Sequence, residues 1–210
     1  MKKLKIELKP DNVIPWGGLF IVLDHFDRTI APIIDKKLGE RCKSYGYKYS
    51  EVIRTLMTVY FCGGGCVEDI NKILNKALKH HPTLKSCSPD TVLRMFEKLA
   101  TDSEKYTSNE GKTYDFNTAE NLNGLLLSVL SDTGYFDPEK EYDLDFDHNY
   151  LETEKFDTKK TYKKFLGYCI AAAVIGDMIV GIEGIDGNNQ VTFMQEKTLE
   201  RLFLRLLERI

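Results

Sequence analysis

The spacing of apolar residues changes near residue 140, and this change constrains the fold more than any other feature of the sequence. From Trp16 to about Gly134 apolar residues recur at helical intervals, whereas from Tyr142 onward they alternate with polar residues as in a β-strand. Helices followed by strands indicate an α+β protein. We therefore expect a helical region at residues 1–140 and a sheet-containing region at 141–210.

Within the helical region, capping residues and apolar spacing predict four helices. Ser50 is a candidate N-cap, and the run Gly63-Gly64-Gly65 ends the helix that it opens. Ser88, followed by Pro89 at the first helical position, opens another helix. We expect its apolar face to consist of Val92, Leu93, Phe96 and Leu99, and the remaining helices to lie at 66–79 and between Asn117 and Leu130.

Two of these helices could form a helix-turn-helix. The segments 66–79 and 88–100 follow each other in the chain, and the second would expose Thr91, Arg94 and Lys98, with Asp90 beside them. The same pairing is common in helical domains that do not contact DNA, so alone it is weak support. We expect these side chains on a DNA-facing surface.

The second region is predicted to contain three strands and a helix. Tyr142, Leu144 and Phe146 alternate with aspartates. Two further strands are predicted at Gly167–Ile175 and Met178–Ile185, joined by a turn at Gly176-Asp177. An amphipathic helix at 198–210 follows, with an apolar face of Leu199, Leu202, Phe203, Leu206 and Leu207.

Asp143, Asp145 and Asp147 share one face of the first predicted strand. Like charges in such a row repel one another unless a cation neutralises them. Mg²⁺ takes hard oxygen ligands and is commonly held by one or two carboxylates together with substrate phosphates. The row therefore predicts a metal site for phosphoryl-transfer chemistry.

A calcium-binding EF-hand loop is an alternative interpretation of this segment. Asp143, Asp145, Asp147 and Glu154 match its first, third, fifth and twelfth positions. However, its sixth position needs glycine for a sharp turn and is His148, and strands instead of helices are predicted around it. The EF-hand is therefore the weaker interpretation.

Four lysines and a tyrosine cluster at residues 159–164. Such a segment is often a solvated loop, but beside an acidic metal site it could hold a nucleic-acid backbone through Lys159, Lys160, Tyr162, Lys163 and Lys164. The whole chain has 29 Lys and Arg against 32 Asp and Glu, a net charge of −3. Without an overall basic field, any contact with DNA must be local.

The sequence shows neither an export signal nor an apolar stretch of membrane-spanning length, so we expect a cytoplasmic protein without a membrane partner. Its five cysteines are then expected to be reduced. Cys62, Cys66 and Cys87, with His80 and His81, would allow a zinc site, but structural zinc usually has more tightly paired ligands. Buried thiols are the simpler interpretation.

Several segments, taken in order, resemble the DDE transposases of insertion sequences, in the group numbered thirteen-eighty. They are Lys9-Pro10-Asp11-Asn12-Val13-Ile14-Pro15-Trp16-Gly17-Gly18-Leu19, Tyr45-Gly46-Tyr47-Lys48-Tyr49-Ser50, Leu144-Asp145-Phe146-Asp147-His148 and Gly167-Tyr168. The resemblance implies an RNase H-like domain that uses three acidic residues and Mg²⁺ or Mn²⁺ to cut and rejoin DNA. It further implies the terminal inverted repeats of the element as the DNA partner, a homodimer, and association with the nucleoid when DNA is bound.

Carried over to this chain, the resemblance implies that Asp147 is the first catalytic and metal-binding aspartate, with Asp145 as the alternative. Gly176-Asp177 and Gly187-Asn188 resemble later family elements, although Ile185-Asp186 stands where Arg-Pro often precedes the Gly-Asn pair. The family's second aspartate follows the last helix predicted here, and its glutamate comes much later. The resemblance therefore implies that residues 1–140 form a helical DNA-binding or dimerisation region and that residues 141–210 form an incomplete RNase H-like domain of three strands and one helix. The chain would be an inactive, truncated transposase or a non-catalytic DNA-binding or dimerising fragment.

Overall fold

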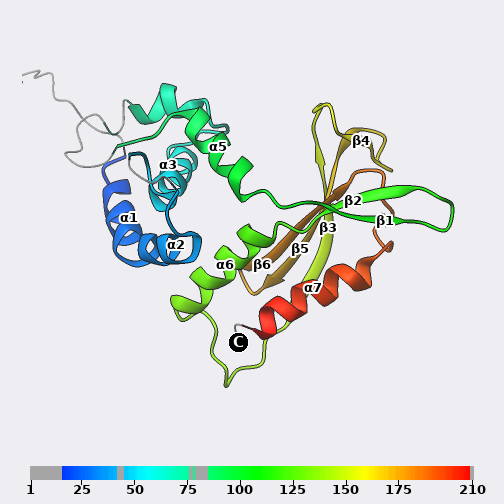
Figure 1. Ribbon diagram of the computed structural model, residues 1–210. Coiled ribbons are helices and arrows are strands. Elements are labelled where there is room, and N and C mark those ends of the chain that lie inside the picture. The colour runs from blue at the N-terminus through cyan, green and yellow to red at the C-terminus, as the bar shows by residue number, and fades with distance from the viewer. Residues whose placement is uncertain (1–15, 42–44, 76–77, 79–84, 209–210) are drawn as a thin grey trace, which may run out of the picture.

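The computed structural model describes residues 16–41, 45–75, 78 and 85–208. Its first part is mostly helical and its second part is built around an antiparallel sheet, which confirms the expected α+β class. Figure 1 shows α1, α2, α3 and α5 gathered on one side of the molecule and the sheet on the other, with α6 between them.

The helical part opens with three consecutive elements: α1 (Leu19–His25), the π-helical turn η1 (Phe26–Ile30) and α2 (Ala31–Leu38). Gly39 ends α2 with a φ of 69°, a conformation that favours glycine. The helix α3 (Tyr49–Phe61), the π-helical turn η2 (Ile70–Leu74) and α5 (Pro89–Leu99) complete this part. Their common core includes Leu23, Phe26, Ile34, Val52, Val59, Leu74, Val92 and Met95.

The start of one predicted helix is confirmed and that of another is wrong. Ser88 caps α5, because its Oγ accepts a hydrogen bond from the Thr91 amide at 3.3 Å. In α3, by contrast, the N-cap is Lys48, whose amide donates to Glu51 Oε2 at 2.8 Å. Ser50 lies inside this helix and donates its hydroxyl to Asp35 Oδ2 on α2 at 2.9 Å. Ser50 therefore joins two helices and does not begin one.

The buried face of α5 also differs from the prediction. Val92, Met95 and Leu99 are buried, whereas Leu93 and Phe96 are 47% and 37% exposed. The buried residues form a narrower i, i+3, i+7 stripe, which leaves the adjacent row in contact with solvent. The partner helix expected at 66–79 is described only in part, as η2, and its end lies outside the described residues. The described residues therefore do not confirm a helix-turn-helix.

The sheet has six strands in the order β1-β2-β6-β5-β3, with β4 paired to β5, and all pairs are antiparallel. The strands are β1 (Glu104–Thr107), β2 (Thr113–Asn117), β3 (Leu144–Glu152), β4 (Lys159–Lys160), β5 (Leu166–Ile175) and β6 (Met178–Asp186). The three predicted strands and the turn at Gly176 are confirmed. The β1–β2 hairpin and β4 were not predicted.

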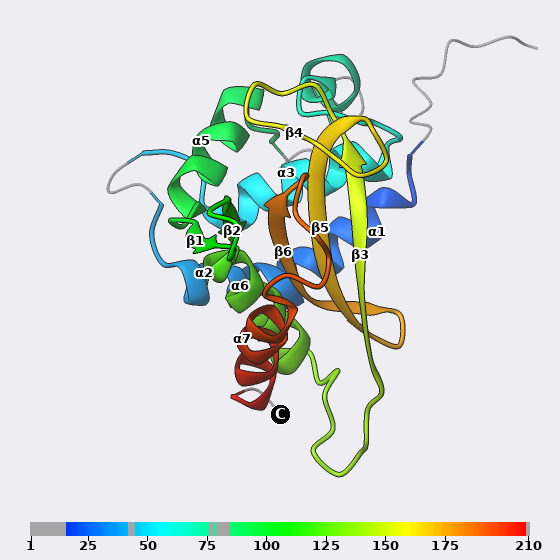
Figure 2. The same ribbon diagram turned by 90° about the vertical axis from the view of Figure 1, so that its right-hand side faces the viewer.

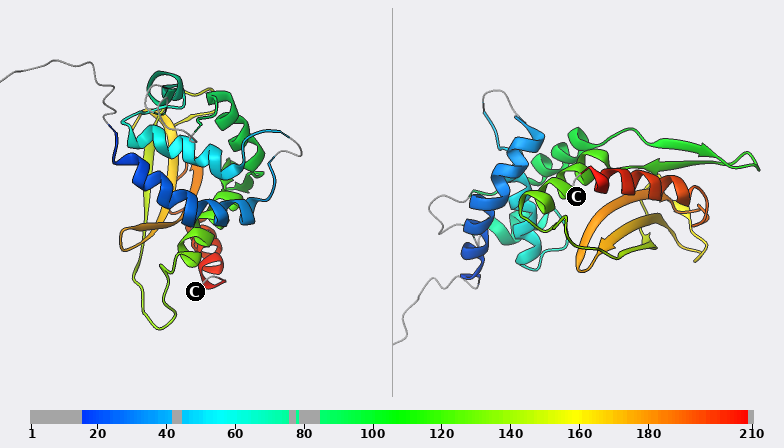
Figure 3. Two further views of the ribbon diagram at one scale, coloured as in Figure 1. Left: turned by 90° about the vertical axis from the view of Figure 1, so that its left-hand side faces the viewer. Right: turned by 90° about the horizontal axis from the view of Figure 1, so that it is seen from below.

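One face of the sheet is covered by α6 (Glu120–Asp132) and α7 (Gln195–Leu207), as the right-hand view of Figure 3 and the turned view of Figure 2 show. Leu127 and Leu130 of α6 meet Leu202 and Leu206 of α7 over Ala173 of β5. Because Leu125 of α6 belongs to the core of the helical part, α6 is buried on two sides. On α7, the predicted apolar residues Phe203 and Leu207 are 47% and 75% exposed.

Candidate functional site

Two aspartates of β3 lie on the sheet face opposite α7, here called the outer face. Asp145 and Asp147 are exposed, while Phe146 between them packs into the core beneath α7. Their cross-strand partners are Val174 and Ala172 of β5. Among the described residues neither carboxylate has an ion-pair partner, so both are free to receive a cation. The predicted sharing of a strand face is therefore confirmed for Asp145 and Asp147 but is wrong for Asp143, because β3 begins at Leu144.

Asp147 also satisfies a backbone amide on the edge of β3 that no strand pairs with among the described residues. Its Oδ1 accepts a hydrogen bond from the amide of His148 at 2.7 Å, and Asn149 Oδ1 accepts one from the amide of Tyr150 at 2.8 Å. Among the described strands, only β5 pairs with β3. The two side chains therefore satisfy amides that an exposed edge would otherwise leave unpaired.

The EF-hand interpretation is wrong. Residues 144–152 form a continuous strand that pairs with β5 over its whole length, so they do not wrap around an ion as an EF-hand loop does. A strand also places Asp145 and Asp147 roughly 6.5 to 7 Å apart along its axis. Within the described ranges, no group of three or more His, Cys, Asp or Glu side chains is arranged to hold a metal ion.

The predicted lysine-rich segment lies at one end of the sheet. Lys159 and Lys160 form β4, and residues 161–165 connect β4 to β5. Residues 159–165 together are called here the lysine loop. Thr161 closes it through an amide hydrogen bond to the Phe165 carbonyl at 2.8 Å. Lys163 and Lys164 are exposed at its tip. The lysine side chains therefore face solvent, as a contact with DNA phosphates requires.

Aromatic rings support the lysine loop. Tyr162, 69% exposed, meets Tyr150 of β3 edge to face with ring centroids 4.9 Å apart. Lys163 Nζ lies 5.6 Å from the Tyr150 ring centroid and 5.9 Å from that of Tyr162. Burial raises the pKa of Tyr150 to about 12, so its hydroxyl stays protonated at neutral pH.

The carboxylates and the lysine loop are not side by side. Asp147 pairs with Ala172 and β4 pairs with Gly167, five residues apart along β5, or roughly 16 Å at about 3.3 Å per residue. In addition, the Tyr150 ring lies on the α7 side of the sheet, opposite the aspartates. The structure therefore separates two groups that the sequence suggested were neighbours.

The third predicted group lies on α5 in the helical part. Arg94 and Lys98 are exposed, and Lys98 Nζ donates to the carbonyl of Arg41 at 3.2 Å. Thr91 is occupied at the start of the helix, where its Oγ1 lies 3.0 Å from Ser88 Oγ. Arg94 is therefore the side chain of this group with no hydrogen bond to another described residue, while Lys98 retains further N–H donors for a partner.

A turn after β6 contributes Asn188, noted above only as part of the family resemblance, and Asn189, which the sequence analysis did not single out. Both line a pocket of about 460 Å³ together with Thr161 and Tyr162 of the lysine loop, and the turn that carries them approaches the start of β5 closely. Gly187 allows this approach, because a Cβ there would lie 2.1 Å from the carbonyl oxygen of Gly167. The only signal in the sequence was the Gly187-Asn188 pair, which alone indicates a turn.

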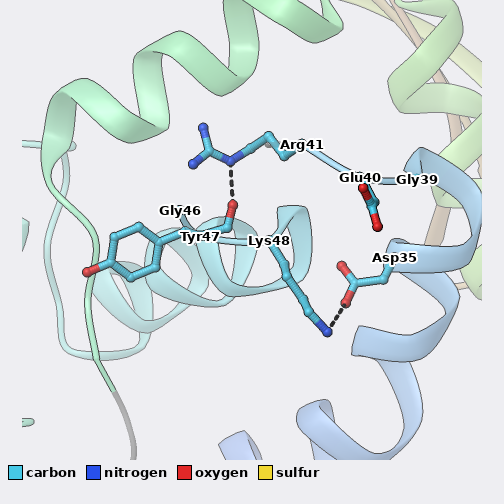
Figure 4. A pocket seen from close by; sticks show the side chains of 7 residues that line it. All are labelled: Asp35, Gly39, Glu40, Arg41, Gly46, Tyr47 and Lys48. Atoms are coloured by element: carbon cyan, nitrogen blue, oxygen red, sulfur yellow. Dashed lines mark hydrogen bonds and ion pairs between the residues drawn. The ribbon is translucent and has the colours of Figure 1, made fainter. Parts of the chain in front are cut away.

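A second pocket, shown in Figure 4, lies in the helical part beside α2 and α3. Three of its charged side chains have partners: Arg41 Nε donates to the Tyr47 carbonyl at 2.6 Å, and Lys48 Nζ lies 3.7 Å from Asp35 Oδ2. These contacts connect the start of α3 to the end of α2. We assign this pocket a structural role.

The possible zinc ligands are placed only in part. Cys62 and Cys87 are buried, whereas Cys66 is exposed. Burial raises the pKa of the Cys87 thiol, which favours its neutral form. His80 and His81 lie outside the described residues.

Comparisons with protein families, with curated proteins and with solved structures found no match. In the part of the chain that the structure describes, no helix is both long and apolar enough to cross a membrane.

Proposed function

We propose that this chain belongs to a DNA transposase of the DDE type, in which β3 contributes a metal-binding carboxylate and the lysine loop contacts DNA phosphates. The observation that carries the proposal is the exposed pair Asp145 and Asp147 on a strand whose other face is buried. Three antiparallel strands followed by a helix, β3-β5-β6-α7, are compatible with the start of an RNase H-like domain.

The donor set suits Mg²⁺ or Mn²⁺. Magnesium is often held by one or two carboxylates and completes its coordination with water and substrate phosphates. Asp147, with Asp145 as the alternative, would hold such an ion on the outer face. A bound divalent ion polarises a phosphoryl oxygen and stabilises the charge that develops during strand transfer.

The lysine loop has a separate role in the proposal. Its lysines would neutralise backbone phosphates and so hold a DNA strand. Because β5 pairs with both β3 and β4, it fixes the distance between this DNA contact and β3. The separation of roughly 16 Å corresponds to a few nucleotides, because successive phosphates rise about 3.4 Å along one strand. Arg94 and Lys98 on α5 would make a further backbone contact from the helical part.

Salt-dependent DNA binding tests the proposal. We expect mobility-shift titrations with duplex DNA to show affinity that falls steeply with salt, because each neutralised phosphate contributes a slope of about −0.9. Changing Lys159, Lys160, Lys163 and Lys164 to Ala should reduce the slope in proportion to the number of phosphates that these lysines neutralise. Unchanged binding would remove the lysine loop from the proposal, and affinity independent of salt would contradict it altogether.

The control removes the same charge elsewhere. Lys85, Lys112, Lys140 and Lys197 are exposed, and the last three form surface ion pairs with Glu110, Asp137 and Glu200. Such pairs contribute only about 0–1 kcal/mol each. Their change to Ala should leave the slope close to that of the unmodified chain.

A further inference from the structure

The pocket between the lysine loop and the turn after β6 has an aromatic wall and a cationic rim. We call it the Tyr162 pocket; its volume is about 460 Å³, and its lining includes Tyr150, Lys160, Tyr162, Asn189 and Val191. Lys163 Nζ lies near both tyrosine rings. A flat ligand could lie against these rings while its anionic group meets a lysine.

Asn189 is the unusual member of this lining. Its residue surface is only 4% exposed, yet neither its amide oxygen nor its amide nitrogen has a hydrogen-bond partner. Leaving buried polar groups unpaired costs about 1–3 kcal/mol each, and most such groups in proteins are satisfied. Both amide atoms are also shielded from solvent, so they present no contact to a ligand in the open pocket.

We infer that the Tyr162 pocket receives one unpaired base of a DNA strand, with the ring of the base stacked on Tyr162 and the adjoining phosphate on Lys160 or Lys163. This inference rests on the proposed DNA function. Base stacking on an aromatic side chain is tolerant of base identity but requires a base with a free face. The pocket would therefore distinguish an unpaired base from a paired one, and a base from an abasic site.

The position of the pocket separates it from the carboxylates. Tyr150 lies on the α7 side of β3 and Asp147 on the outer face. The base would therefore be held away from the reacting phosphate. Because extruding a base from a duplex costs a few kcal/mol, strand ends and unpaired positions are the favoured ligands.

Fluorescence anisotropy with the full chain tests the inference. The probes are a labelled single-stranded oligonucleotide, the same strand in a duplex, the strand with consecutive abasic sites, and a labelled deoxyadenosine monophosphate. We expect single-stranded DNA to bind more tightly than the abasic strand by about fivefold or more, the loss of one stacked base. Tyr162→Leu should abolish that difference, whereas Tyr60→Leu, an exposed tyrosine on α3, should preserve it.

Asn189→Ala is a second control. Because the amide is shielded from solvent and has no partner, its removal should leave the preference for the intact strand over the abasic strand unchanged. Equal binding of the intact and abasic strands by the unmodified chain would overturn the pocket itself.

The other outcomes of this experiment distinguish a failure of the inference from a failure of the proposed function. Salt-dependent duplex binding without any preference for unpaired bases would contradict the inference and leave the proposed function standing. Binding of the monophosphate as tightly as the strand would identify a free nucleotide as the ligand and exclude a strand-holding role. Failure to bind any DNA probe would contradict both.

Discussion

Glu183 of β6 is fully buried, and both of its carboxylate oxygens accept hydrogen bonds from Arg201 of α7, at 2.9 Å from Nε and 2.7 Å from Nη2. Arg201 also reaches Glu104 of β1 through Nη1 at 2.9 Å. Arg205 Nη1 lies 3.7 Å from the same buried carboxylate. Arg201 therefore attaches α7 to two strands that lie far apart in the sequence, β6 and β1.

Arg201→Met should destabilise the chain by about 3–5 kcal/mol, because it leaves most of the buried Glu183 charge uncompensated. Urea unfolding followed by circular dichroism measures the change. The control is Lys197→Met, which breaks the exposed Lys197–Glu200 pair on the same helix and should cost at most about 1 kcal/mol. If Arg201→Met and Lys197→Met have equal effects, the ion pair does not hold α7. The double variant Arg201→Met, Glu183→Leu should recover much of the loss.

Gly187→Ala should destabilise the fold by about 1–3 kcal/mol, because the added methyl would meet backbone atoms of Gly167 and Lys159 and not a flexible side chain. Gly65→Ala is the matched control, since a Cβ there would meet nothing within 4 Å. Thermal unfolding compares the two variants. A stable Gly187→Ala chain would show that the turn after β6 can move away from β5.

The pKa of Asp157 is held below its ordinary value mainly by the Tyr168 hydroxyl, which donates to Oδ1 at 2.5 Å. Tyr168→Phe should raise this pKa toward the ordinary value of an aspartate, as carboxyl NMR titration would show. A depressed pKa stabilises the fold above the unfolded value and stops doing so as pH falls through the folded value. The stability difference between the two chains should therefore persist from about pH 5 to 8 and shrink below about pH 4.

Tyr162→Phe is the control for this titration, because within the described ranges no hydrogen bond joins its hydroxyl to Asp157. An Asp157 pKa that is the same in the Tyr168→Phe variant would show that neighbouring lysines, and not the tyrosine, set its value.

Mn²⁺ should broaden the backbone NMR signals of residues around Asp147 and its cross-strand neighbour Ala172. Asp147→Asn should remove most of this broadening, because it keeps the side-chain volume but not the charge that holds the ion. Asp143→Asn, outside β3, should retain it, and Asp145→Asn should be intermediate. Loss with Asp145→Asn and retention with Asp147→Asn would move the metal ligand two residues along the strand. Retention in both would contradict the metal site.

Those parts of the fold that depend on neighbouring residues could be predicted from the sequence. Alternation predicts β3, β5 and β6, because a strand with one buried face shows its period within a few residues. Ser88 and Pro89 locate the start of α5, since capping is a contact between residues three positions apart. The exposed position of Asp145 and Asp147 followed from the same alternation.

Which distant segments meet is settled by tertiary packing and not by any local pattern. Phe116 of β2 pairs with Ile185 of β6. The alternation of residues within the β1–β2 hairpin does not predict which distant strand will pair with it. A glutamate is normally predicted on the surface, but Glu183 is buried because Arg201 reaches it from another element. From the sequence alone, Asn189 is likewise typical of a turn residue. Its place beside Tyr162 depends on the close packing of Gly187 against Gly167, a contact between backbones that side-chain patterns do not encode.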